Sequence, residues 1–272
     1  MKILIIADVH NRPGGSVKTL LKIENVIKKV NADLIVFLGD IVHGPDFTEN
    51  DKYERYLRQV LDLTGSVPFA TVFGNHDDEC HITKDEILSV MYSYPNCLTK
   101  GCNYVVKMKG EQLLFMDSGS YYQGEGSYYD TVNLSDTLNA VKAVKDGEKA
   151  ILFQHIIMPD IIDMCEESRI YKPGCVWGKN GWIRFKKGVK HTGVMLERPC
   201  PPDINTSQLS CLAPYIKAAV FGHDHLNDFE LYIQGVKFIQ CPGSGSNSYD
   251  WYRPSSVKIL DTKTLKIQQI FL

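Results

Sequence analysis

The sequence predicts an α/β fold built as one domain. Its first 75 residues alternate short apolar runs, typical of buried strands, with longer segments whose apolar residues recur at helical spacing. The expected strands are 2–7, 33–38 and 68–73, and the expected helices are 16–30 and 50–64. This alternation predicts a parallel sheet with helices over its faces. The 272 residues contain no repeat, low-complexity tract or linker, so we expect a single domain.

The predicted elements change character after about residue 100. Runs 103–108 and 111–116 flank a glycine and predict a β-hairpin, which a helix at 135–145 and a strand at 149–153 follow. Prolines and glycines interrupt the segment 156–205, which predicts an irregular insertion that forms a lid or loop over the pocket. The remaining expected strands are 217–221, 228–233, 236–240, 256–260 and 265–271.

Composition and charge exclude several classes of function. The net charge of −2 and the lack of a basic stripe argue against a dedicated nucleic-acid partner, because such proteins neutralise many phosphates. No apolar stretch reaches the length of a membrane span and the N-terminus lacks the pattern of a signal peptide, so we expect a cytoplasmic protein without a membrane partner. The eight cysteines include no CxxC pair, which predicts free thiols rather than disulfides or a zinc knuckle.

Residues with metal-binding or acid–base chemistry follow five of the predicted strands. They are Asp8, His10, Asp40, Asn75, His76, Asp77, His155, His223 and His225. In open α/β sheets, ligands bind beyond the carboxyl ends of the strands, so we expect these side chains to meet in one crevice. Residues two apart in an extended chain point to the same side, which lets the D-x-H and H-x-H pairs each aim two groups at one place.

The residue types at these strand ends predict a metal site. Carboxylate and imidazole together suit borderline metals such as zinc, manganese or iron. Seven candidate ligands are too many for one tetrahedral ion, but they suit two ions that share a bridging carboxylate. Two such ions can clamp the attacking and leaving oxygens of a phosphoryl group during in-line displacement. Each motif alone is weak evidence for a metal site, since D-x-H occurs often by chance. The occurrence of all of them, each after a predicted strand, is the evidence for the site.

The order D-x-H, G-D, G-N-H-D, H, G-H-x-H resembles the calcineurin-like metallophosphoesterase superfamily. The stretches "VFGNHDDE", "FQHIIMP" and "VFGHDHLNDF" are most similar to its purple-acid-phosphatase-like branch. The resemblance implies a β-sandwich of two mixed sheets flanked by helices. It implies one such domain over residues 1–272, with 156–205 as a loop insertion over the active site.

The resemblance also implies roles for individual residues. One metal ion is expected to bind Asp8, His10 and His225. The other is expected to bind Asn75, His155 and His223. Asp40 bridges both ions, which are divalent or trivalent manganese, iron or zinc. A metal-bound hydroxide attacks phosphorus, and His76 serves as general acid for the leaving oxygen or as a donor to the transition state.

Two positions depart from the purple acid phosphatase pattern. His10 stands where those enzymes have glycine, and His43 stands where they have the tyrosine that binds ferric iron and gives the colour. We therefore expect a protein that is not purple. The role of His43 stays open between a contact to substrate or to a metal ligand, an extra ligand and a plain loop residue. The candidate substrate contacts are Asn75, His76, His43 and Arg253.

Several weaker candidates keep two interpretations. Asp77 either orients the adjacent histidine or bonds the backbone, and Glu79 is expected to belong to an acidic turn. Asn227 and Asp228 are candidates to support the nearby metal-binding histidine. The segment 120–130 is either a loop over the site or a long turn. In the stretch 244–254, the candidates for substrate contact are Tyr249, Trp251, Tyr252 and Arg253, and the alternative is an aromatic loop packed on a sheet edge.

These observations predict a binuclear metal-dependent phosphoric ester hydrolase that acts on a small phosphorylated substrate. We expect a phosphomonoesterase. The alternative is a phosphodiesterase, for example on cyclic nucleotides or phospholipid head groups, because the same two-metal chemistry serves both. A third interpretation is a catalytically dead scaffold, which the intact His76 argues against. The sequence leaves the natural substrate, the metal and the oligomeric state open.

Overall fold

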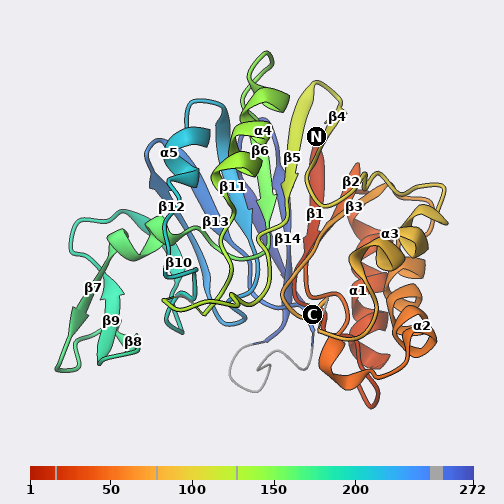
Figure 1. Cartoon of the computed structure of the whole chain (residues 1–272), viewed down its shortest axis with the longest axis horizontal. Helices are drawn as coiled ribbons and strands as arrows, with labels where there is room; N and C mark the ends of the chain where they lie inside the picture. The colour runs from red at the N-terminus through yellow and green to blue at the C-terminus, as the bar shows by residue number, and fades with distance from the viewer. Residues whose placement is uncertain (16, 78, 127, 246–253) are drawn as a thin grey trace.

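The computed structural model describes residues 1–15, 17–77, 79–126, 128–245 and 254–272. Two β-sheets lie face to face, and helices cover the outer face of each sheet (Figure 1). The layers therefore run helix, sheet, sheet, helix. This is the sandwich of two mixed sheets flanked by helices that the resemblance implied, rather than the single parallel sheet that the strand–helix alternation suggested.

The first sheet has five strands in the order β15-β14-β1-β2-β3. Its strands are β1 (Lys2–Ile6), β2 (Leu34–Leu38), β3 (Phe69–Val72), β14 (Ser256–Asp261) and β15 (Ile267–Phe271). The strands β1, β2 and β3 are parallel, and β14 and β15 run antiparallel at the edge. The helices on its outer face are α1 (Val17–Val30), α2 (Asn50–Leu61) and α3 (Lys84–Tyr92), with the short 3-10 helices η1 (Gly44–Asp46) and η2 (Asp62–Thr64).

The second sheet has seven strands in the order β10-β12-β13-β11-β6-β5-β4. Its strands are β4 (Tyr104–Met108), β5 (Glu111–Met116), β6 (Ala150–Gln154), β10 (His191–Val194), β11 (Ile216–Phe221), β12 (Asp228–Ile233) and β13 (Val236–Gln240). The four strands β13, β11, β6 and β5 are parallel to one another. The helices α4 (Leu134–Val144) and α5 (Gln208–Leu212) lie on its outer face (Figure 1).

The predicted hairpin is confirmed, with β4 and β5 paired antiparallel. Lys109 and Gly110 form its two-residue turn, with φ of +48° and +81°. Two successive left-handed residues are the signature of a type I′ turn, whose twist matches that of the flanking strands.

The segment 156–205 is more regular than the sequence suggests. It contains a 3-10 helix, a small three-stranded sheet and the edge strand of the large sheet. Its elements are η3 (Pro159–Met164), β7 (Cys165–Ser168), β8 (Val176–Trp177), β9 (Trp182–Phe185) and β10. The small sheet stands at one end of the molecule, close to β10 (Figure 1). The expectation of an irregular segment therefore missed these short strands, and its function as a lid or loop over the pocket stays a prediction.

Apolar side chains from both sheets fill the space between them. Ile5 and Val36 come from the five-stranded sheet, and Phe115, Phe153 and Val220 come from the seven-stranded sheet. All five are essentially inaccessible to solvent. Because both sheets depend on this one core, they form a single domain. Among the described residues, no helix is both long enough and apolar enough to cross a membrane.

Candidate dimetal centre

The predicted metal ligands and His76 lie directly beyond the carboxyl ends of β1, β2, β3, β6 and β11. Backbone hydrogen bonds hold the loops after these strands together. The amide of Asp8 donates to Gly39 O at 3.2 Å, and that of His10 donates to Asp40 O at 2.9 Å. The amide of Gly222 donates to His155 O at 3.0 Å, and the amide of His223 donates to the Asp8 carboxylate at 3.1 Å, so loops from both sheets meet at one place.

Four of the site residues have left-handed backbone. Their φ angles are +51° at Asp8, +46° at His10, +49° at Asp40 and +71° at His223. The expectation that the D-x-H and H-x-H pairs converge because the chain is extended is therefore wrong, since sharp turns present these side chains instead. A left-handed non-glycine residue costs about 1–2 kcal/mol, and such strain gathers at functional sites.

The first cluster consists of Asp8, His10, Asp40 and His225, whose potential ligand atoms all lie within 4.8 Å of one another. The Nε2 atoms of His10 and His225 are 3.1 Å apart. Asp40 Oδ2 lies 3.6 Å from His10 Nε2, and Asp8 Oδ1 lies 3.5 Å from His225 Nε2. Imidazole and carboxylate lone pairs thus converge on one small volume, the donor set that suits a transition metal.

The second cluster consists of Asp40, His155 and His223, again with ligand atoms within 4.8 Å of one another. Asp40 belongs to both clusters. His155 Nε2 lies 3.3 Å from Asp40 Oδ2, and both side chains are almost completely buried. A carboxylate shared between two groups of ligands is the arrangement that a dimetal site requires.

Three buried atoms at the centre have no hydrogen-bond partner among the described residues. They are Asp40 Oδ2, Asn75 Oδ1 and His155 Nε2. Buried polar groups are normally satisfied, and a site for an ion is one of the few explanations for an exception. The residues present therefore fit metal ions, although the metal itself stays open.

Burial and the neighbouring carboxylates act in opposite directions on the histidines of the site. His155 Nδ1 donates to Leu38 O at 2.7 Å, so Nε2 is the nitrogen that faces the cluster. Burial lowers the pKa of His10 and of His223 well below the usual value, which favours the neutral ligand form. Burial acts against the charged form of His155 as well, but the Asp40 carboxylate raises its pKa to about 10. The buried carboxylates thus attract positive charge.

Asp77 binds backbone, which decides between its two interpretations. Its carboxylate accepts hydrogen bonds from the amides of Gly74, Asp40 and Ile41 at 2.8–3.1 Å. Burial and the nearby Asp40 charge raise the pKa of Asp77 to about 7. Asp77 therefore fastens the loop after β3 to the loop after β2.

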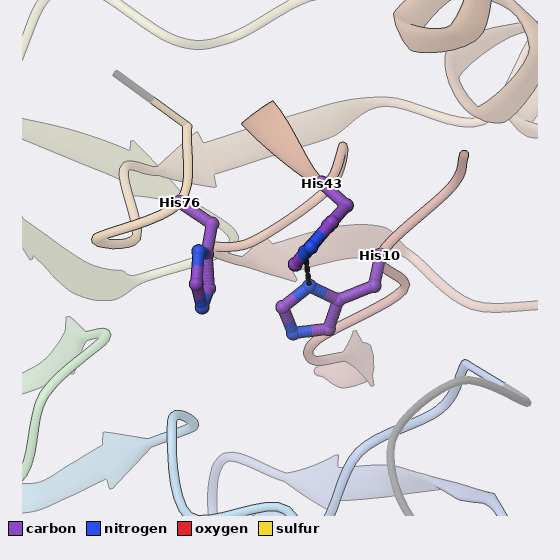
Figure 2. Close-up of side chains that lie close together, drawn as sticks. All are labelled: His10, His43 and His76. Atoms are coloured by element: carbon purple, nitrogen blue, oxygen red, sulfur yellow. Dashed lines mark hydrogen bonds between the residues drawn. The ribbon is translucent and has the colours of Figure 1, made fainter. Parts of the chain in front are cut away.

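His76 and His43 lie beside His10 of the first cluster, and the ring nitrogens of these three histidines form a further group within 4.8 Å of one another (Figure 2). His43 Nδ1 is 3.3 Å from His10 Nδ1, on the imidazole edge away from the His225 contact. His76 is 24 % exposed and pairs through Nδ1 with the carboxylate of Glu79. The expectation that Glu79 belongs only to an acidic turn is therefore wrong. The spacing of three residues between a histidine and a carboxylate was the signal in the sequence.

The tyrosine-rich segment 120–130 contacts the centre, which decides between its two interpretations. Asn75 Nδ2 donates to Tyr121 Oη at 3.1 Å, and Ser120 Oγ donates to Asn75 O at 3.0 Å. The ring of Tyr129 stands edge-on to the ring of His223, with centroids 4.6 Å apart. The motifs contained no signal for these contacts.

Two other predicted contributions have different outcomes. Asn227 Oδ1 accepts from the amides of Leu196 and Glu197, and Asp228 pairs with Lys258 at 2.7 Å. Their support for His225 stays a prediction. The candidate contacts Tyr249, Trp251, Tyr252 and Arg253 lie outside the described residues.

The curated relatives include a protein named as a phosphatase and proteins named as probable inactive purple acid phosphatases. The chain is 25 % identical over 258 residues to the probable inactive purple acid phosphatase 14 of Arabidopsis thaliana, which covers 84 % of this chain and 62 % of that protein. It is 27 % identical over 293 residues to phosphatase DCR2 of Saccharomyces cerevisiae, covering 90 % and 47 %. The chain thus spans less than two thirds of the length of either relative.

Solved structures share the fold. A dimetal phosphatase from Danio rerio matches with a TM-score of 0.62 and 14 % identity over 100 % of this chain and 98 % of that one. A purple acid phosphatase from yellow lupin matches with a TM-score of 0.55 and 11 % identity over 96 % and 49 %. At such low identity these matches show the fold alone. The model of the calcineurin-like phosphoesterase family matches residues 1–227, and the chain therefore belongs to that family.

Proposed function

We propose that this chain is a binuclear metal-dependent phosphoric ester hydrolase that acts on phosphate monoesters. The observation that carries the proposal is the pair of buried His/Asp clusters that share Asp40, with His76 beside them and partly open to solvent. A buried ligand set with an accessible neighbouring acid is the minimum that ester hydrolysis at such a site requires.

The ligand set sets the charge of the site. Two metal ions, when bound, polarise the phosphoryl oxygens and lower the pKa of a water molecule. Asp8 and Asp40 are the anionic members of the proposed set, and Asn75 offers a neutral oxygen. Two divalent or trivalent ions therefore keep a net positive charge, which favours a phosphate anion. We propose manganese, iron or zinc, because mixed imidazole and carboxylate ligands suit all three.

His76 is the proposed general acid. Glu79 occupies its Nδ1, so Nε2 is the nitrogen available to donate a proton to the leaving oxygen of a bound ester. Its exposure of 24 % contrasts with the nearly complete burial of Asp8, Asp40 and His155. Substrate can thus reach His76, while Asp8, Asp40 and His155 stay shielded from water.

The same experiment distinguishes the proposal from two alternative functions. The clusters serve diester hydrolysis equally well, so a phosphodiesterase is the first alternative. The names of the Arabidopsis relatives, which describe those proteins as probably inactive, favour a scaffold as the second. The retained Asp40 and His76 support activity in this chain.

The test compares p-nitrophenyl phosphate with bis-p-nitrophenyl phosphate on protein reconstituted with manganese, iron or zinc. Asp40→Asn should lower activity by more than about 100-fold and reduce bound metal, since even residues that only support a ligand cost 10–100-fold. The matched control is Asp33→Asn, at the opposite end of β2, where Asp33 pairs with Lys109 on the surface. Faster diester hydrolysis contradicts a monoesterase. Metal-loaded protein inert toward both substrates contradicts a hydrolase.

A further inference from the structure

We propose that Glu79 is a positioning residue that fixes His76 and, through Tyr121, Asn75. The inference rests on the proposed function, in which His76 is the acid and Asn75 a ligand. Glu79 lies outside the G-N-H-D motif, three residues after His76 on the same loop. Its side chain is 19 % exposed, so it stands at the rim of the centre.

The first half of the arrangement is the pair between Glu79 and His76. The Glu79 carboxylate accepts a hydrogen bond from His76 Nδ1. A carboxylate at Nδ1 selects the tautomer that carries its hydrogen there and stabilises the imidazolium form that donates from Nε2. Asp77 cannot take this role, because three backbone amides already engage its carboxylate. His43, which also faces His76, has no carboxylate to offer.

The second half runs through Tyr121. Its hydroxyl accepts from Asn75 Nδ2 at 3.1 Å, and the neighbouring Glu79 carboxylate helps raise the pKa of Tyr121 after the larger effect of burial. Because the Asn75 amide donates to the Tyr121 oxygen, the one hydrogen of that hydroxyl stays free to point elsewhere, and in the proposed arrangement it points to the Glu79 carboxylate. This arrangement engages Asn75 Nδ2 and directs Oδ1, the buried atom without a partner, away from Tyr121. One carboxylate thus orients two neighbours in the sequence.

The readout is the dependence of rate on the leaving group. Phenyl phosphate needs protonation of its leaving oxygen far more than p-nitrophenyl phosphate does. Glu79→Leu, which removes the acceptor, should therefore lose at least about 10-fold more activity on phenyl phosphate than on p-nitrophenyl phosphate. Glu79→Gln should recover part of that loss, because it keeps an acceptor without the charge. At saturating metal, adding Glu79→Leu to His76→Ala should lower kcat no further, since both act on that step through one proton.

Tyr121→Phe tests the second half. It should weaken metal binding by about 10–100-fold, which is typical when a partner of a ligand is lost, and kcat at saturating metal should change less. Tyr128→Phe is the matched control, because Tyr128 packs against Tyr121 but is 66 % exposed. Glu125→Gln is the control for charge in the neighbouring loop, where Glu125 is exposed. Unchanged metal affinity in Tyr121→Phe contradicts the link to Asn75.

Histidine-ring ¹⁵N NMR separates this inference from the proposed function. The wild-type spectrum should show His76 with its hydrogen on Nδ1, and Glu79→Leu should shift that tautomer. A shift in protein that hydrolyses neither ester supports the role of Glu79 and contradicts the hydrolase. Equal losses on both substrates together with an unchanged tautomer overturn the role of Glu79 and leave the hydrolase standing.

Discussion

Asp40 is the residue on which the arrangement of the site depends most. One carboxylate oxygen accepts the amide of His76 at 2.9 Å, and the other faces both His155 and His10. Its own amide donates to Asp77, and its backbone is left-handed. Each of these contacts limits the direction in which the carboxylate can point, so the bridge between the clusters is preorganised before an ion binds.

Gly39, directly before Asp40, has a position that no other residue fits. Its φ is +84°, and a Cβ there would lie 2.4 Å from His155 Nδ1. Gly39→Ala should therefore destabilise the fold and reduce bound metal. The matched control is Gly110→Ala, whose φ of +81° is similar but whose Cβ would meet nothing within 4 Å. The control should cost about 1–2 kcal/mol in urea unfolding and keep its metal. Equal losses in the two variants would show that crowding at His155 is unimportant.

The identity of residue 43 predicts the colour of the iron-loaded protein. Imidazole gives no tyrosinate-to-iron charge transfer, so iron-loaded protein should lack the strong visible band of purple acid phosphatases. His43→Tyr is the positive control, because position 43 lies 3.3 Å from the ring of His10 and a phenolate there would be close to the first cluster. The measurement is visible absorption after reconstitution with iron. A strong band in the wild-type protein would contradict the prediction.

At the scale of elements, α3 shows how local sequence starts a helix near the site. Thr83 caps its N-terminus, with the Thr83 hydroxyl accepting from the amide of Glu86 and the Glu86 carboxylate accepting from the amide of Thr83. Two amides that the helix cannot pair are thereby satisfied. The loop that carries His76 and Glu79 ends where this helix begins, so the cap also limits the movement of that loop.

Removing the cap should therefore weaken α3. Thr83→Ala is expected to lower the free energy of unfolding by about 1 kcal/mol, the usual cost of losing a threonine cap. Ser89→Ala in the same helix is the control, since Ser89 is exposed and bonds only its own helix through Asp85 O. It should change stability by less than about 0.5 kcal/mol. Chemical denaturation measures both, and equal values would argue that the cap contributes nothing.

At the scale of the whole molecule, a buried lysine links the two sheets. Lys258 lies on β14 of the five-stranded sheet and is 1 % exposed. Its Nζ donates to Gln240 O at the end of β13 and pairs with Asp228 at the start of β12, each at 2.7 Å. A buried charge is tolerated only with such partners, so Lys258 specifies how the edge of one sheet meets the other.

Lys258→Met tests this link. Methionine keeps much of the volume but removes the charge opposite Asp228, and breaking a buried pair from one side costs about 3–5 kcal/mol. Lys28→Met is the control, because its pair with Glu24 on α1 is 64 % exposed at the lysine and is worth about 0.5 kcal/mol or less. Thermal and urea unfolding of both variants provide the comparison. A loss in Lys258→Met as small as that in the control would refute the role of the link.

The sequence by itself determined most strands of the two large sheets and the chemical types of the candidate ligands. Apolar periodicity placed the strands and the β4–β5 hairpin, because a buried strand must be apolar whatever it packs against. The candidate ligands could be predicted because each follows a strand within a short motif. The strands of 156–205 were missed, because short, partly exposed strands carry little periodic signal.

Only the tertiary structure decided how these residues act together. Pairing of distant strands created the two sheets, and the left-handed turns at Asp8 and Asp40, not extended chain, aim the ligands. Tyr121 meets Asn75 across 46 positions of sequence, a distance over which no local pattern carries information. Glu79 lies three residues after His76, so a local pattern could have suggested the pair. The sequence offers Asp77 as well, and only the structure shows that backbone amides bind Asp77 while Glu79 pairs with His76. The sequence determines which side chains are carboxylates, because that is a property of each residue. Only the fold determines which carboxylate pairs with His76, because backbone amides already bind Asp77 and leave Glu79 available.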